Sequence, residues 1–139
     1  MDKAGPAFIN SHTLREIAEE RVGAAFTGSA EQDVRAWMVD IIAGGVKEGY
    51  ESQAQATMGG SFDVRSRLGE IHVPTTVIHS EKDATVPLFA GEALAKGIPG
   101  ATLRVIKGEG HFANVQVPEK FNPFLADALR IPQDLVPKR

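Results

Sequence analysis

Two side chains in the second half of the sequence have the types expected of a proton-transferring pair. Asp83 ends the stretch VPTTVIHSEKD, and His111 follows later in the glycine-rich turn KGEGHF. Imidazole has an ordinary pKa of about 6.5, so a histidine accepts a proton at neutral pH. A carboxylate on the other ring nitrogen holds the imidazole in one tautomer and stabilises its charged form. Asp83 and His111 therefore indicate general-base chemistry, which requires a third group to act on.

The elements that position this pair are predicted to be two strands and a connecting helix. TTVIH at 75–79 is rich in β-branched residues, and ATLRVIKG at 101–108 is predicted to be the second strand. Between them, PLFAGEALAKG at 87–97 has proline at a helix start and glycine at its end. The predicted buried face of this helix consists of Leu88, Ala93 and Leu94. This order indicates a parallel βαβ unit, in which the loops after both strands lie at the same edge of the sheet.

A last helix is predicted at 118–130, in the stretch PEKFNPFLADALR. Pro118 suits its first position, and Pro123 is expected to kink or delay it. Its large apolar residues are Phe121, Phe124, Leu125 and Leu129. Residues 131–139 are expected to form a flexible tail.

Residues 10–69 have the pattern of successive helices. Thr13 and Glu16 have capping-box spacing ahead of a helix of about 12 residues. The apolar face of that helix contains Leu14, Ile17, Ala18 and Val22. Ser29 and Gln32 repeat the box before a second helix. Its apolar stripe contains Val34, Trp37, Met38, Ile41 and Ile42. We interpret the stripe as core, and the alternative for Trp37 and Met38 is the wall of a substrate pocket.

Two shorter helices are predicted to follow. The stretch YESQAQATMGG at 50–60 is expected to end at its glycine pair, and SFDVRSRLG at 61–69 is expected to begin with Ser61 as its cap and end at Gly69. The first part of the chain is therefore expected to be a small helical layer.

Composition excludes several classes of function. The 139 residues fit one domain, and a net charge of −3 gives no basic surface for nucleic acid. The absence of cysteine removes thiol nucleophiles, disulfides and thiolate-ligated zinc. No apolar run approaches the roughly 20 residues of a membrane span, and the N-terminus lacks the form of a signal peptide. A cytoplasmic protein that contacts neither nucleic acid nor membrane is expected.

No cofactor and no metal site is expected. GEGH lacks the spacing of a dinucleotide-binding loop. A metal site from His72, His79 and Asp83 is disfavoured, because successive residues of a strand point to opposite faces. We interpret His79 instead as a core histidine with its hydrogen bonds satisfied.

Residues 68–129 resemble the C-terminal part of an α/β-hydrolase, in the order and spacing of IHVPTTVIHSEKDATVP and AGEALAKGIPGATLRVIKGEGHFANVQVPEKF. They are most similar to lid-bearing members such as enol-lactonases and haloperoxidase-like esterases. The resemblance implies an α/β fold: a helical lid at 1–69, a small parallel βαβα unit with an exposed sheet edge at 70–130, and a tail at 131–139. It also implies that Asp83 is the acid and His111 the base of a Ser-His-Asp triad that hydrolyses a carboxylic ester or lactone.

The nucleophile of that family, a serine within Gly-x-Ser-x-Gly, is missing from this sequence. The serines are Ser11, Ser29, Ser52, Ser61, Ser66 and Ser80. Ser29 and Ser61 are better explained as helix caps. Ser80 ends the strand before Asp83, where the family more often has glycine. The chain alone is therefore expected to lack meaningful esterase turnover.

Two parallel strands are too few to form a stable sheet, and the strand at 75–80 is expected to expose one edge. We therefore predict self-association as a homo-oligomer, or pairing with a complementary N-terminal hydrolase half. The alternatives are a non-catalytic binding or assembly protein derived from a hydrolase, and a truncated product.

Overall fold

The computed structural model describes residues 6–26, 32–58 and 63–136. The chain divides into two compact units, the first made of residues 1–24 and 29–63 and the second of residues 25–28 and 64–139. Each unit is described separately below.

The first unit is helical. It contains α1 (Pro6–Ser11), α2 (Leu14–Ala25), α3 (Gln32–Ala43) and α4 (Lys47–Met58). The predicted capping box is confirmed, because the Thr13 N–H donates to Glu16 Oε2 (2.8 Å) and the Glu16 N–H donates to Thr13 Oγ1 (3.3 Å). The ammonium of Lys47 donates to the carbonyl oxygen of His12 (2.8 Å). α4 begins three residues earlier than the stretch chosen from sequence, which started at Tyr50.

The interpretation of the α3 stripe as core is wrong. α3 has no buried residue, and Trp37 is 54% exposed. Helical spacing shows that one face is apolar, whereas burial also requires an element packed across that face. The predicted cap at Ser29, the stop at Gly59 and Gly60, and the cap at Ser61 lie outside the described residues.

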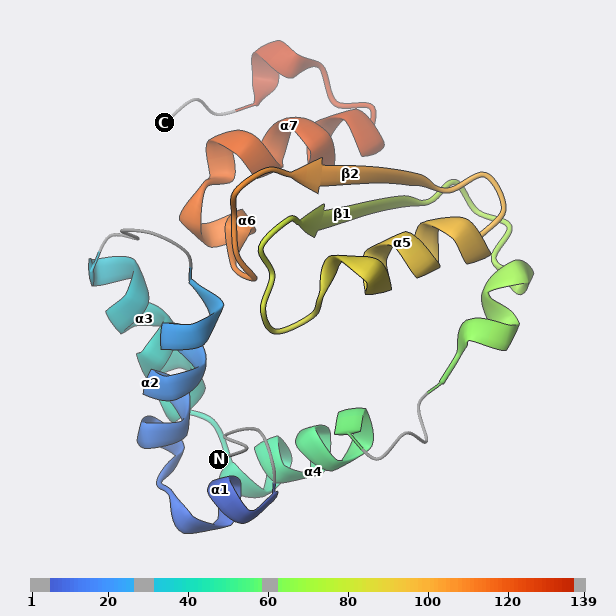
Figure 1. The fold of residues 1–139 in the computed structure, drawn as a ribbon. Helices are drawn as coiled ribbons and strands as arrows, with labels where there is room; N and C mark the ends of the chain where they lie inside the picture. Colours follow the sequence, from blue (N-terminus) through green and yellow to red (C-terminus); the bar gives the residue numbers. More distant parts are fainter. Residues whose placement is uncertain (1–5, 27–31, 59–62, 137–139) are drawn as a thin grey trace. The chain divides into compact units, whose positions relative to one another are not determined.

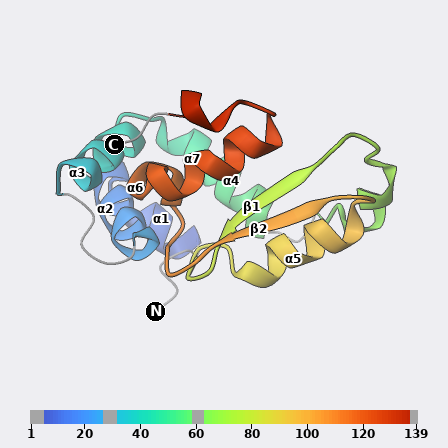
Figure 2. The same ribbon diagram turned by 90° about the horizontal axis from the view of Figure 1, so that it is seen from above.

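The second unit contains the predicted strand, helix and strand. β1 (Thr76–Ser80), α5 (Leu88–Gly97) and β2 (Thr102–Ile106) follow one another, and the two strands pair in parallel with Val77 opposite Leu103. This confirms the predicted βαβ unit. α5 lies on one side of the strands and α7 (Pro118–Ala128) on the other (Figures 1 and 2). The loops that follow β1 and β2 lie at the same end of the strand pair.

Two details of this unit differ from the predictions. The predicted buried face of α5 is wrong, since Ala93 and Leu94 are exposed and the buried residue is Gly91. The predicted helix at 61–69 is a short 3₁₀ helix, η1 (Arg65–Glu70), which continues one residue past the predicted end at Gly69. Leu68 is the one buried side chain of η1. Because packing of an apolar face stabilises a helix, a single buried side chain does not support a longer α-helix here.

The C-terminal elements are α6 (Ala113–Gln116), α7 and a 3₁₀ turn, η2 (Gln133–Leu135). α6 was not predicted from the sequence. Pro118 is the first residue of α7, as predicted, and the helix continues through Pro123. It ends two residues before the predicted Arg130, which has a positive φ of 56° and leaves the helix.

Among the described residues, β1 has β2 as its only strand partner, so the sheet is open at its other edge, as expected. The Thr102 N–H donates to Thr75 O, and the Glu81 N–H donates to Ile106 O (both 3.0 Å). Along a strand, the backbone groups of successive residues point to opposite edges. Thr76, Ile78 and Ser80 therefore direct theirs to the open edge, where another strand can pair.

Candidate active site

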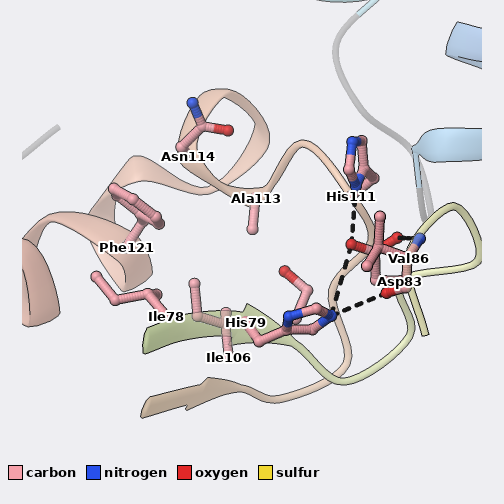
Figure 3. Close-up of a pocket in the computed structure, with 10 residues that line it drawn as sticks. Ile78, His79, Asp83, Val86, Ile106, His111, Ala113, Asn114 and Phe121 are labelled. Carbon is pink, nitrogen blue, oxygen red and sulfur yellow. Dashed lines mark hydrogen bonds and ion pairs between the residues drawn. The ribbon is translucent and has the colours of Figure 1, made fainter. Parts of the chain in front are cut away.

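Asp83 and His111 form a hydrogen-bonded pair at the carboxyl ends of the two strands. The distance between His111 Nδ1 and Asp83 Oδ2 is 2.8 Å (Figure 3). The Asp83 side chain is 7% exposed and that of His111 is 32% exposed. The backbone N–H of His111 donates to Ala25 O (2.8 Å), which fixes the turn that carries the imidazole.

The Asp83 carboxylate is held by its own loop. Its Oδ1 accepts hydrogen bonds from the N–H groups of Thr85 (2.9 Å) and Val86 (2.8 Å). Burial is the largest single influence and raises the pKa of Asp83, but the Val86 N–H, His111 and the Thr85 N–H together lower the pKa below its ordinary value of 3.8. The carboxylate is therefore ionised at neutral pH and can only accept hydrogen bonds.

The ionised partner determines the tautomer of His111. Because Asp83 Oδ2 accepts, Nδ1 carries the hydrogen, and Nε2 on the far side of the ring is the basic nitrogen. Nε2 can take a proton from a hydroxyl group, and Asp83 stabilises the imidazolium that results. This geometry has the two properties that a general base requires, a fixed tautomer and a fixed orientation.

A second carboxylate, Glu81, holds the loop before His111. Glu81 accepts from Lys107 Nζ and from the Gly108 N–H (both 2.9 Å). Lys107 and then Gly108 lower the pKa of Glu81. Gly108 has a φ of +78°, a conformation that other residues rarely adopt. Glu81 was not predicted as a site residue, although an acid just after the first strand and a lysine just after the second were signals for this pair.

The same loop is tied to α7 through Glu109. The buried Glu109 carboxylate pairs with the ammonium of Lys120, and the Glu109 carbonyl accepts from the Lys82 N–H (2.9 Å). A buried charge needs a partner of this kind. This residue was also absent from the predicted site.

A pocket of about 240 Å³ lies beside the pair (Figure 3). Its apolar lining residues are Ile78, Val86, Ile106, Ala113 and Phe121, and its polar ones are His79, Ser80, Asp83, His111 and Asn114. No lysine or arginine is among these described residues, so the lining suits a neutral, largely apolar group.

His79 is a satisfied histidine, as predicted. Its Nε2 lies 2.8 Å from the carbonyl oxygen of Val86, and its side chain is 12% exposed. Among the described residues, no group of three or more histidine or acidic side chains is arranged to hold a metal ion.

The six serines differ in their surroundings. Ser11 and Ser52 donate to carbonyl groups of their own helices, at Ala7 O (2.9 Å) and Glu48 O (2.8 Å). Ser66 is exposed on η1, and Ser80 is buried and lines the pocket. Ser29 and Ser61 lie outside the described residues. In the described part of the chain, no helix has the length and apolar character needed to cross a membrane.

Known proteins resemble this chain both in sequence and in fold. The 2-hydroxy-6-oxononadienedioate/2-hydroxy-6-oxononatrienedioate hydrolase 2 of Pseudomonas putida is 40% identical over 68 residues, which are 49% of this chain and 24% of that protein. The enol-lactonase from Burkholderia xenovorans LB400 superposes with a TM-score of 0.80 at 25% identity, over 89% of this chain and 48% of that one. The bromoperoxidase from Bacillus anthracis gives a TM-score of 0.78 at 27% identity, over 89% and 46%.

In each comparison the chain spans less than half the length of the other protein. The family model described as alpha/beta hydrolase fold matches residues 7–118, which include both strands, Asp83 and His111. This match covers most of the sequence, and the chain superposes on part of the enol-lactonase structure. The chain therefore belongs to the α/β-hydrolase family and corresponds to the C-terminal part of its fold.

Proposed function

We propose that Asp83 and His111 are the acid and the base of a Ser-His-Asp triad that hydrolyses a carboxylic ester or lactone. The observation that carries this proposal is the 2.8 Å bond from His111 Nδ1 to an anchored, ionised carboxylate beside a pocket. Nε2 accepts the proton of the attacking serine hydroxyl and later returns it to the leaving alkoxide.

The ester or lactone class is supported by the pocket and by the similar proteins. The lining is apolar around a few polar groups, which suits the acyl part of an uncharged substrate. A lactonase is among the structures with the same fold. Helices α1 to α4 are proposed to correspond to the lid segment of such a hydrolase.

The serine and the oxyanion hole are proposed to come from a complementary N-terminal hydrolase segment. The sequence contains no Gly-x-Ser-x-Gly, and the open edge of β1 offers the backbone groups through which such a segment would extend the sheet. The chain by itself is proposed to be inactive, because loss of the serine alone lowers turnover by about a millionfold.

The test is to co-express the chain with an α/β-hydrolase segment that contains Gly-x-Ser-x-Gly. Two signals are measured: labelling by a fluorophosphonate probe and hydrolysis of a p-nitrophenyl ester. We expect both only in the complex, and a loss of turnover of about a millionfold in the His111→Ala variant. Labelling of the isolated chain would show that it contains a nucleophile and would contradict the proposal. Light scattering that finds a compact, cooperatively folding monomer would contradict the pairing.

A further inference from the structure

A second imidazole, that of His79, lies next to the acid, and the triad mechanism does not use it. His79 is in β1, four residues before Asp83, and its Nε2 is 3.8 Å from Asp83 Oδ2. The same nitrogen is 2.8 Å from Val86 O. Figure 3 shows Asp83 between His79 on one side and His111 on the other.

The hydrogen bond to Val86 fixes the orientation and tautomer of the His79 ring. A carbonyl oxygen can only accept, so Nε2 of His79 carries the hydrogen. The other ring nitrogen, Nδ1, faces α5 at Gly91. A Cβ at position 91 would lie 2.7 Å from His79 Nδ1 and 2.9 Å from its Cγ, so glycine is required to make room for the ring. This explains why the buried residue of α5 is a glycine.

Val86 connects this fixed ring to the acid. Its N–H donates to Asp83 Oδ1 (2.8 Å), while its carbonyl accepts from His79 (2.8 Å). Asp83 Oδ2 in turn accepts from His111 (2.8 Å). A continuous series of hydrogen bonds therefore runs from His79 through Val86 and Asp83 to His111.

Hydrogen bonds, and not burial of side chains, hold the loop that follows the acid. Residues 84–87 are all exposed, so burial of their side chains does not fix the loop. His79 is largely buried and belongs to a paired strand, which makes it the rigid end of the series.

We propose that His79 is a positioning residue for the acid. Its Nε2–H holds Val86, and thereby holds the Val86 N–H against Asp83, so that Asp83 Oδ2 faces His111; Gly91 provides the space for the ring. The proposal rests on the proposed function only for its effect on turnover, because the position of the acid loop is a property of this chain.

The first measurement is the pH titration of the Asp83 carboxyl carbon, followed by NMR in the full chain. The variants are His79→Phe, which keeps the ring and removes the donor, and His79→Gln, which keeps a donor. Gly91→Ala displaces the ring by adding a Cβ, and Gly23→Ala is its matched control, because nothing lies within 4 Å of a Cβ added at that helical position.

In the wild type, His79→Gln and Gly23→Ala, the Asp83 midpoint is expected to lie below its ordinary 3.8. In His79→Phe and Gly91→Ala the midpoint is expected to rise, because the hydrogen bond from Val86 weakens while the burial remains. Titration of both variants as in the wild type would overturn the proposal. If His79→Phe fails to fold, Gly91→Ala decides in the same way.

The second measurement is turnover in the complemented enzyme. His79→Phe is expected to lower kcat by roughly a hundredfold, as a misplaced catalytic group does, with KM unchanged and with His79→Gln close to the wild type. Wild-type kcat in His79→Phe would contradict the role of His79. A shifted Asp83 midpoint in a complex without any esterase activity would instead leave the positioning role intact and refute the proposed function.

Discussion

Replacing Asp83 by asparagine separates the proposed catalytic role of this carboxylate from its structural role. Asparagine keeps an oxygen for the Thr85 and Val86 N–H groups and puts an NH2 donor where Oδ2 accepts from His111. Two donors then face each other across 2.8 Å. His111 is expected to change to the other tautomer, in which Nε2 carries the hydrogen and cannot act as a base.

The expected magnitudes differ widely between stability and turnover. A hydrogen bond to a charged group stabilises by about 1.5–3 kcal/mol and a neutral one by about 1 kcal/mol. Because His111 is part-exposed and can bond the asparagine in its new tautomer, the free energy of unfolding should fall by only about 1 kcal/mol. The wrong tautomer should lower kcat about 10⁴-fold, which is about 5 kcal/mol in the activation free energy.

Three assays follow this variant. Two-bond ¹H–¹⁵N NMR correlations give the tautomer of His111, urea unfolding gives the stability, and ester hydrolysis in the complemented enzyme gives kcat. Asp127→Asn is the matched control, because Asp127 forms an exposed ion pair with Arg104 (3.0 Å) away from the pocket. An unchanged His111 tautomer, or a stability loss of several kcal/mol, would refute the assignment.

Three further predictions concern the framework around the site. Thr13→Ala should destabilise the chain by about 1 kcal/mol in urea unfolding, since it removes the capping hydroxyl of α2; an unchanged midpoint would show that the cap is not needed. Gly108→Ala should lower the free energy of unfolding by about 1–2 kcal/mol because of the positive φ, and it should shift the NMR signals of His111. If neither change is observed, the turn does not need glycine and the prediction is wrong. Stability should also fall in acid. The folded-state pKa values of Asp83 and Glu81 lie below the ordinary 3.8 and 4.5, so their contribution is complete above those values and is lost as the pH falls through the lowered ones. Urea midpoints measured from about pH 6 downward test this, and a flat profile would contradict it.

Much of the fold could be predicted because its signals are local. The capping box at Thr13, the β-branched run before His79 and the proline at position 118 each act through neighbouring residues. The predictions that failed concern which face an element buries. Trp37 has helical spacing but is exposed, and α5 buries Gly91 instead of its leucines, because burial depends on what the rest of the chain places opposite.

The candidate site divides in the same way. The sequence by itself determined the residue types of Asp83 and His111, their positions after two strands, and the lack of Gly-x-Ser-x-Gly. Only the tertiary structure decided that Asp83 is ionised between two imidazoles, that His111 carries its hydrogen on Nδ1, and that Glu81 and Glu109 hold the loop. Strand order and residue type are local properties of the chain, whereas a hydrogen bond between residues far apart in sequence exists only once the parallel strands pair.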